Sequence, residues 1–151
     1  MTRVERALAL HAAGSSCSQA VLTAFAQDFG LPDETAHRIA TGLGAGLGRQ
    51  QLVCGAVSGA ALVLGLALGA RKSEEQEAKE ATYAAVCSFV EAIRSEFGAV
   101  DCRALLEDLD LRDPAGKAAV KERGLPDRVC NPIIRRSVRL LEERLGLDER
   151  R

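Results

Sequence analysis

The sequence is poor in aromatic residues, has no tryptophan and carries no block of basic residues. Aromatics make up 3% of the 151 residues, and 20 basic residues stand against 21 acidic ones, for a formal charge of -1. The chain therefore lacks the usual residues of a base-stacking platform, an aromatic cofactor cage or a nucleic-acid surface. We expect no nucleic-acid partner, and a core built mainly from alanine, leucine and valine.

Long apolar runs are also scarce, since only residues 52–70 are uncharged over a length that could span a membrane. This run is full of glycine and alanine, and every other segment is amphipathic and charged. We therefore predict a buried helix and no stable membrane insertion. The N-terminus has no apolar stretch of the length that a secretory signal needs, so the expected location is cytoplasmic.

No segment alternates polar and apolar residues in the way that strands do, whereas helical spacing and capping patterns recur. Thr2 with Glu5 and Ser16 with Gln19 fit the capping box, and Ser73 with Gln76 has the same spacing. We predict one all-α domain over residues 1–151, with about six or seven helices around the glycine- and alanine-rich central helix. The main helices are expected at 3–13, 16–29, 32–43, 52–70, 73–97 and 131–145, with short helical segments after Asp101 and Asp113.

Glycines spaced four apart on the central helix remove side-chain bulk from one face. The two pairs are Gly55 with Gly59 and Gly65 with Gly69, and each is expected to let a neighbouring helix approach closely. The preceding glycines at 42, 44, 46 and 48 lack the lysine of a phosphate-binding loop, so a flexible hinge is the better interpretation.

The five cysteines form no C-x-x-C pair, which excludes a thioredoxin-type motif and a zinc ribbon. Four of them lie at or near predicted helix starts. Cys17 follows the Ser16 cap, Cys102 follows the Asp101 cap, Cys130 precedes an Asn131 cap, and Cys54 lies near the start of the central helix. Because a helix N-terminus stabilises a thiolate, we expect these four thiols to have lowered pKa values and to gather as nucleophiles or ligands.

Three other residues receive weaker predictions. Cys87 lies on the apolar stripe of residues 73–97 and is expected to be buried in the core, apart from the other cysteines. His11 and His37 lie on charged or mixed helix faces, so neither is the first choice for a ligand or a proton carrier.

The segments GSSCSQAV at 14–21 and CGAVSGA at 54–60, together with Cys102 and Cys130, resemble the C_GCAxxG_C_C family, which is described as redox-active. The resemblance covers nearly the whole chain and selects the same four cysteines, with Gly55 and Gly59 in the central motif. It implies a thiol-based redox or metal function, and a functional link to a transporter, since members are often encoded near transporter genes.

Three hypotheses remain open. In the first, Cys17, Cys54, Cys102 and Cys130 cycle between thiol and disulfide with an unknown redox partner. The pair expected to form a disulfide is Cys17 with Cys54, and Gly55 and Gly59 are expected to line the binding site. In the second, the same four cysteines bind a cofactor, either zinc or an iron-sulfur cluster. In the third, the protein is a helical interaction module that serves a transporter. A homodimer is also expected, because paired glycines favour tight helix association.

Overall fold

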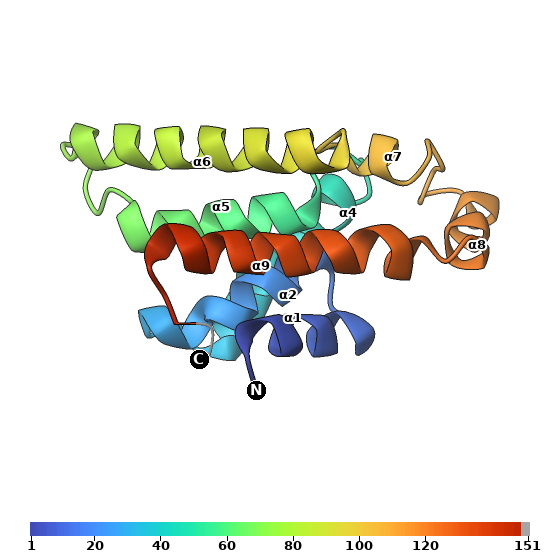
Figure 1. The fold of residues 1–151 in the computed structure, drawn as a ribbon, viewed down its shortest axis with the longest axis horizontal. Coiled ribbons are helices and arrows are strands. Elements are labelled where there is room, and N and C mark those ends of the chain that lie inside the picture. The colour runs from blue at the N-terminus through green and yellow to red at the C-terminus, as the bar shows by residue number, and fades with distance from the viewer. Residues whose placement is uncertain (149–151) are drawn as a thin grey trace.

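The computed structural model describes residues 1–148, which fold into helices and contain no β-strand (Figure 1). This confirms the predicted all-α class. The elements are α1 (Arg3–Ala12), α2 (Cys17–Phe25), η1 (Ala26–Phe29), α3 (Asp33–Ala40), η2 (Thr41–Leu43), α4 (Gly44–Leu47), α5 (Gly55–Leu68), α6 (Gln76–Phe97), α7 (Cys102–Leu105), α8 (Pro114–Glu122), η3 (Pro126–Cys130) and α9 (Asn131–Leu145).

Helix α5 is central, as predicted, because it packs against α2, α6 and α9. In Figure 1, α6 lies along one side of the molecule, α1 and α2 lie on the other, and α7 and α8 extend from one end. The first half of α5 is buried, but Leu66 and Leu68 near its end are 42% and 39% exposed. The prediction of burial therefore holds for α5 as far as Leu64 and not for its last turn.

The glycines at the start of α5 bring α2 into direct contact with it. A Cβ atom on Gly59 would lie 2.9 Å from the carbonyl oxygen of Ser18, and one on Gly55 would lie 2.9 Å from the amide nitrogen of Ser18. The predicted close approach is thus confirmed for this pair. It is wrong for the second pair, because no neighbour lies within 4 Å of a Cβ atom on Gly65.

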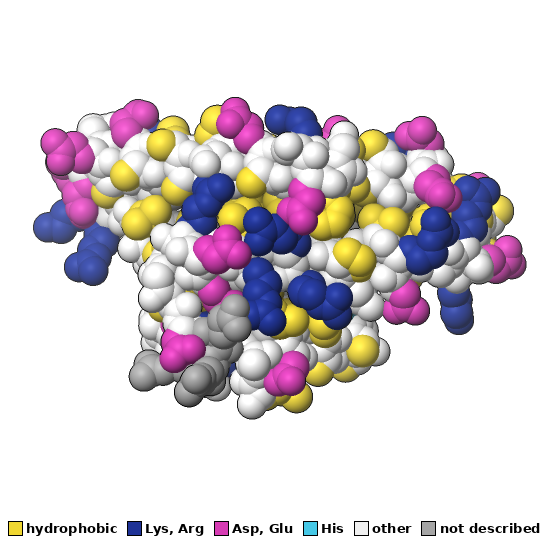
Figure 2. Space-filling model, in the orientation of Figure 1, with side chains coloured by type: hydrophobic (Ala, Val, Ile, Leu, Met, Phe, Trp, Pro, Cys, Tyr) yellow, Lys and Arg dark blue, Asp and Glu magenta, His cyan; other side chains and the backbone are white. Residues whose placement is uncertain are grey.

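Helix α6 is 22 residues long and begins at Gln76 without a side-chain cap. The predicted Ser73 cap is wrong, because Gln76 donates its side-chain amide to the Ser73 carbonyl instead. Figure 2 shows basic side chains over α9 and acidic ones over α6, with apolar atoms between the two helices. Arg136 of α9 donates to Glu96 of α6 at 2.8 Å across this boundary.

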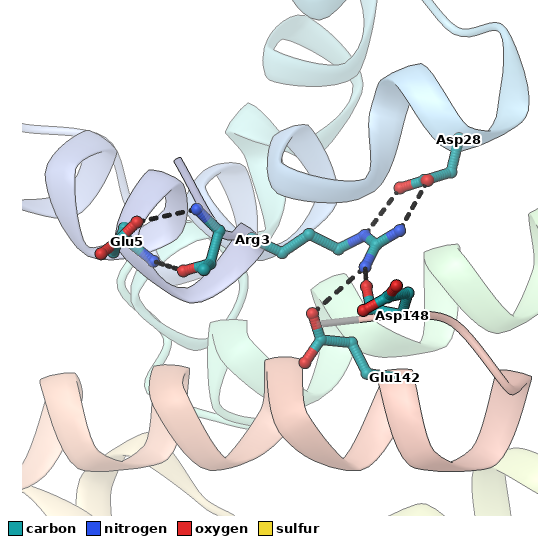
Figure 3. Close-up of polar contacts among 6 residues, drawn as sticks. Arg3, Glu5, Asp28, Glu142 and Asp148 are labelled. Carbon is teal, nitrogen blue, oxygen red and sulfur yellow. Dashed lines mark hydrogen bonds and ion pairs between the residues drawn. The ribbon is translucent and has the colours of Figure 1, made fainter. Parts of the chain in front are cut away.

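A buried arginine ties α1 to the end of α9 (Figure 3). The Arg3 side chain is 1% exposed, and it donates from Nε and Nη2 to both carboxylate oxygens of Asp28 at 2.8 and 2.7 Å. Its Nη1 donates to Glu142 of α9 at 3.2 Å and to the backbone carbonyl of Asp148. Because a buried charge is stable only when it is paired, this network fixes the position of α1 against α9.

Within residues 1–148, no helix is both long enough and apolar enough to cross a membrane. Helix α5 accounts for most of the uncharged run that raised this possibility, and it ends at Leu68. The apolar character of α5 serves instead to bury Gly55, Ala56, Val57, Gly59, Ala60, Val63 and Leu64 in the core.

Candidate cysteine site

Cys54 and Cys102 are placed by a short antiparallel contact between two segments far apart in the sequence. The Cys54 amide donates to the Val100 carbonyl at 2.8 Å, and the Cys102 amide donates to the Leu52 carbonyl at 2.7 Å. A single bridge between Val53 and Asp101 completes the contact. The start of α5 is thereby held beside the start of α7.

The approach to Cys54 is a tight turn anchored by Gln51. Its backbone has positive φ at four non-glycine residues, which are Ala45, Leu47, Arg49 and Gln51. Gly46 allows the chain to fold back, because a Cβ atom there would lie 2.5 Å from the amide nitrogen of Leu52. The buried Gln51 side chain donates to the Leu109 carbonyl at 2.7 Å and accepts from the Leu111 amide at 2.9 Å. The glycine-rich stretch that we predicted as a hinge is thus a tight turn, and the hydrogen bonds of Gln51 hold its C-terminal end in place.

Cys17 is the first residue of α2 and directly follows Ser16, the N-cap of the predicted capping box. The Ser16 side chain accepts from the Gln19 amide at 3.3 Å, and the Gln19 side chain accepts from the Ser16 amide at 2.9 Å. The missing side chain of Gly55 lets Cys17 lie against α5, since a Cβ atom on Gly55 would lie 3.2 Å from the Cys17 Cβ. The start of α2 therefore meets the start of α5.

Cys130 immediately precedes α9, as predicted, but the chain is already helical at this point, contrary to the predicted cap. It ends the π-helical turn η3 and continues into α9 with helical dihedral angles, φ -64° and ψ -49°. The backbone at Asn131 is also helical, so Asn131 is not a cap. Its side chain is instead engaged by Asp127 and His11.

The four predicted cysteines gather where these elements meet. The Cys17 thiol makes a hydrogen bond with the Cys130 sulfur, and it also interacts electrostatically with Cys54 and Cys102. Cys102 in turn interacts with Cys54 and Cys130. Cys54 is 7% exposed, and the other three are partly exposed. The expectation that these four sulfurs share one region is confirmed, and the strongest interaction of the Cys17 thiol is with Cys130. The Cys17-Cys54 disulfide stays a prediction, since all five cysteines are free thiols in the structure.

The expected lowering of the four pKa values is wrong for three of the thiols. Burial raises the pKa of Cys54 from 9.0 to about 11 and that of Cys102 from 9.0 to about 12. The pKa of Cys17 is raised well above its ordinary value, first by its hydrogen bond to Cys130 and then by burial. Desolvation of the charged form thus outweighs the field of the helix N-terminus.

Cys130 alone has a lowered pKa, and the cause is the hydrogen bond that its thiolate accepts from Cys17. Of the two sulfurs, Cys130 therefore loses its proton first, and Cys17 keeps the proton that bridges them. Nothing in the sequence distinguished Cys130 from the other three cysteines, because its hydrogen-bond partner comes from a helix more than a hundred residues away.

Cys87 is exposed, so the prediction that it is buried in the core is wrong. Its thiol faces the Glu91 carboxylate of the same helix, with sulfur and oxygen 3.8 Å apart. Only Phe89 and Ile93 of α6 are buried, because a single layer of helices covers one side of α6. Cys87 is nevertheless separate from the other four cysteines, as predicted.

His11 is a neighbour of the site that sequence reasoning left aside. Its Nε2 lies 3.9 Å from the sulfur of Cys17, and its Nδ1 lies 2.8 Å from the side-chain oxygen of Asn131. The available signal was that His11 precedes the Gly14 turn by three residues and Cys17 by six. This spacing puts His11 at the end of α1 that faces the start of α2.

Within the described chain, no group of three or more His, Cys, Asp or Glu side chains is arranged so that it could hold a metal ion. The zinc or iron-sulfur hypothesis for Cys17, Cys54, Cys102 and Cys130 therefore stays a prediction from the sequence. In the structure, residues of α2 fill the space beside Gly55 and Gly59. A cofactor-binding role for these two glycines stays a prediction from the sequence.

The raised pKa of Cys54 predicts a loss of stability in alkaline solution. The folded state releases the Cys54 proton with a pKa of about 11, whereas an ordinary thiol does so near 9.0. The contribution of Cys54 is thus complete below about pH 9 and is lost as the pH rises through about 11. We expect Cys54 to account for on the order of 2 kcal/mol of the fall in the free energy of unfolding over this range, measured by urea unfolding with reductant present. The Cys54→Ala variant should show a shallower decline, whereas an equal decline in that variant and in Cys87→Ser would contradict the assignment.

A comparison with known protein families gives a match over most of the chain. The family model described as "Putative redox-active protein (C_GCAxxG_C_C)" matches residues 15–144, a range that contains all four clustered cysteines. No curated protein and no solved structure shows significant similarity to the chain.

Proposed function

Because this chain belongs to the C_GCAxxG_C_C family of redox-active description, we propose that it performs thiol-disulfide exchange, with Cys130 as the attacking thiolate and Cys17 as the resolving thiol. The observation that carries this proposal is the hydrogen bond between the two sulfurs, which lowers the pKa of Cys130. The thiolate is the nucleophile in thiol chemistry, and a thiol in contact with it is placed to form the next disulfide.

The reaction proceeds in two balanced steps. The Cys130 thiolate attacks one sulfur of a substrate disulfide, whose S-S bond breaks, so that a mixed disulfide forms and one substrate thiolate leaves. Cys17 then attacks the Cys130 sulfur, the mixed disulfide breaks, and the second substrate thiolate leaves. Two electrons pass from the cysteine pair to the substrate, and the protein ends with a Cys17-Cys130 disulfide.

Cys54 and Cys102 form a second pair of thiols beside the first, and we assign them the relay of electrons to or from it. Their pKa values of about 11 and about 12 keep both protonated at neutral pH. They are therefore poor first nucleophiles, but each can exchange with a disulfide formed in contact with it. The donor or acceptor would be a dithiol or disulfide partner in a compartment that keeps thiols reduced, such as the cytoplasm.

Disulfide mapping tests the proposal. We expect reduced protein treated with oxidised glutathione to form the Cys17-Cys130 disulfide first, as read by mass spectrometry of its peptides. In Cys17→Ser, glutathione should remain attached to Cys130, because the resolving thiol is absent. Cys87→Ser, which changes an exposed thiol outside the cluster, should behave as the parent protein does. The proposal fails if Cys130 stays reduced while Cys54 or Cys102 acquires glutathione.

A further inference from the structure

A chain of polar contacts runs from α9 through His11 to the cysteine pair. Asn131 donates its side-chain amide to the Asp127 carboxylate at 3.0 Å, and its side-chain oxygen lies 2.8 Å from His11 Nδ1. His11 Nε2 lies 3.9 Å from the sulfur of Cys17. The contacts join residues of α1, α2, η3 and α9, so only the tertiary structure creates them.

These contacts determine which nitrogen of His11 carries the proton. A carboxylate only accepts hydrogen bonds, so the atom of Asn131 that faces Asp127 is the amide nitrogen. The atom that faces His11 is then the amide oxygen, which also only accepts. His11 Nδ1 must therefore be the donor, and in the neutral imidazole this leaves Nε2 with a free lone pair directed at Cys17.

The Cys17 thiol consequently faces two acceptors, the Cys130 sulfur and His11 Nε2. While Cys130 is a thiolate, it accepts the hydrogen bond that the Cys17 thiol donates. Once Cys130 is part of a mixed disulfide, its sulfur carries no negative charge and is a poor acceptor for the Cys17 thiol. His11 Nε2 is then the base within reach of the thiol that must be deprotonated before it can attack.

We propose that His11 is a catalytic residue of the resolving step, and that Asn131 is a positioning residue that sets its tautomer. His11 Nε2 takes the proton of Cys17 as Cys17 attacks the Cys130 sulfur, and the imidazolium returns that proton to the departing substrate thiolate. The net reaction is still the two-step thiol-disulfide exchange described above, because His11 only accepts a proton and then releases it. This inference rests on the proposed exchange function and assigns its proton acceptor.

The two steps can be timed separately by acid quenching of single turnovers with oxidised glutathione, followed by mass spectrometry. In His11→Gln we expect the glutathione adduct on Cys130 to form at the parental rate, and its conversion to the Cys17-Cys130 disulfide to slow on the order of a hundredfold. His37→Gln is the matched control, because His37 is the second of the two histidines and hydrogen-bonds Ser15 and Gln19 rather than a cysteine. Its conversion rate should stay parental.

The outcomes separate the two claims. If no adduct forms on Cys130 in the parent protein, the exchange function itself is wrong. If the adduct forms and converts equally fast in the parent and in His11→Gln, the exchange stands and the role of His11 is overturned.

The tautomer gives a readout that needs no catalytic variant. Imidazole nitrogen NMR of the reduced parent protein should show His11 protonated at Nδ1, and Asn131→Ala should shift it towards the Nε2-protonated form. A parent protein protonated at Nε2 would overturn the assignment even if His11→Gln failed to fold.

Discussion

The Cys87→Ser protein is expected to react with iodoacetamide in a fast phase at Cys130, and the Cys87→Ser/Cys130→Ser protein is expected to lose that phase. Removal of the exposed Cys87 first eliminates the thiol that any reagent reaches without entering the cluster. The pKa of Cys130 is lowered by its hydrogen bond from Cys17, whereas burial raises the pKa of Cys54 and Cys102. The alkylation rate follows the thiolate, so Cys130 should react first.

The expected difference in rate is large. A pKa of about 12 in place of 9.0 lowers the thiolate fraction of Cys102 about a thousandfold at neutral pH. The more basic thiolate of Cys102 is a better nucleophile, which raises its reaction rate roughly twentyfold and offsets part of this loss. We therefore expect Cys130 to react about fiftyfold faster than Cys102, or more, when each peptide is quantified by mass spectrometry.

Cys102→Ser in the Cys87→Ser background is the control for this measurement. The Cys102 thiol is neutral at neutral pH, so its removal should leave the fast phase at Cys130 intact. Survival of the fast phase after Cys130→Ser would show that another thiol in the cluster is the nucleophile.

Gly59→Ala is expected to destabilise the protein by about 3 kcal/mol, although alanine forms helices better than glycine. The added methyl group would lie 2.9 Å from the Ser18 carbonyl oxygen and 3.1 Å from its Cα. Both are backbone atoms, so α2 as a whole must move away from α5. Since Cys17 starts α2, the same shift should separate it from Cys130 and reduce the fast alkylation phase. Urea unfolding and iodoacetamide labelling measure the two effects.

Gly65→Ala provides the matched control on the same helix. No atom lies within 4 Å of a Cβ at this position, so only the helix propensity changes. We expect a gain of about 0.5–1 kcal/mol in the free energy of unfolding and unchanged labelling at Cys130. Equal effects of the two substitutions would mean that the contact between α2 and α5 is not what Gly59 provides.

Local sequence signals predicted much of the fold. The capping boxes at Thr2 and Ser16 start α1 and α2 as expected, because the residues that satisfy the first amides lie within the same turn. The pattern failed at Cys87, because a helical stripe gives a direction only relative to its own helix. Whether that stripe is covered depends on neighbours, and α6 has them on one side.

The candidate site also has features that the sequence predicts and features that depend on the tertiary structure. Cys17, Cys54 and Cys102 could be selected from the sequence, because their positions at or beside helix starts follow from neighbouring residues. The order of the four pKa values could not be predicted from the sequence, since burial and the Cys17-Cys130 hydrogen bond depend on which helices meet. His11 was missed for the same reason, as its partner Asn131 lies 120 residues further along the chain.

The sequence by itself therefore determined the helical class, the central place of helix α5, and the identity of the clustered cysteines. Helix propensity, capping and glycine spacing act over a few residues, so they can be recognised without a structure. Only the tertiary structure decided that Cys130 is the acidic thiol, that Cys17 is its partner and that His11 faces the pair. Desolvation and hydrogen bonding between distant helices set these properties, and both arise when α1, α2, α5 and α9 pack together.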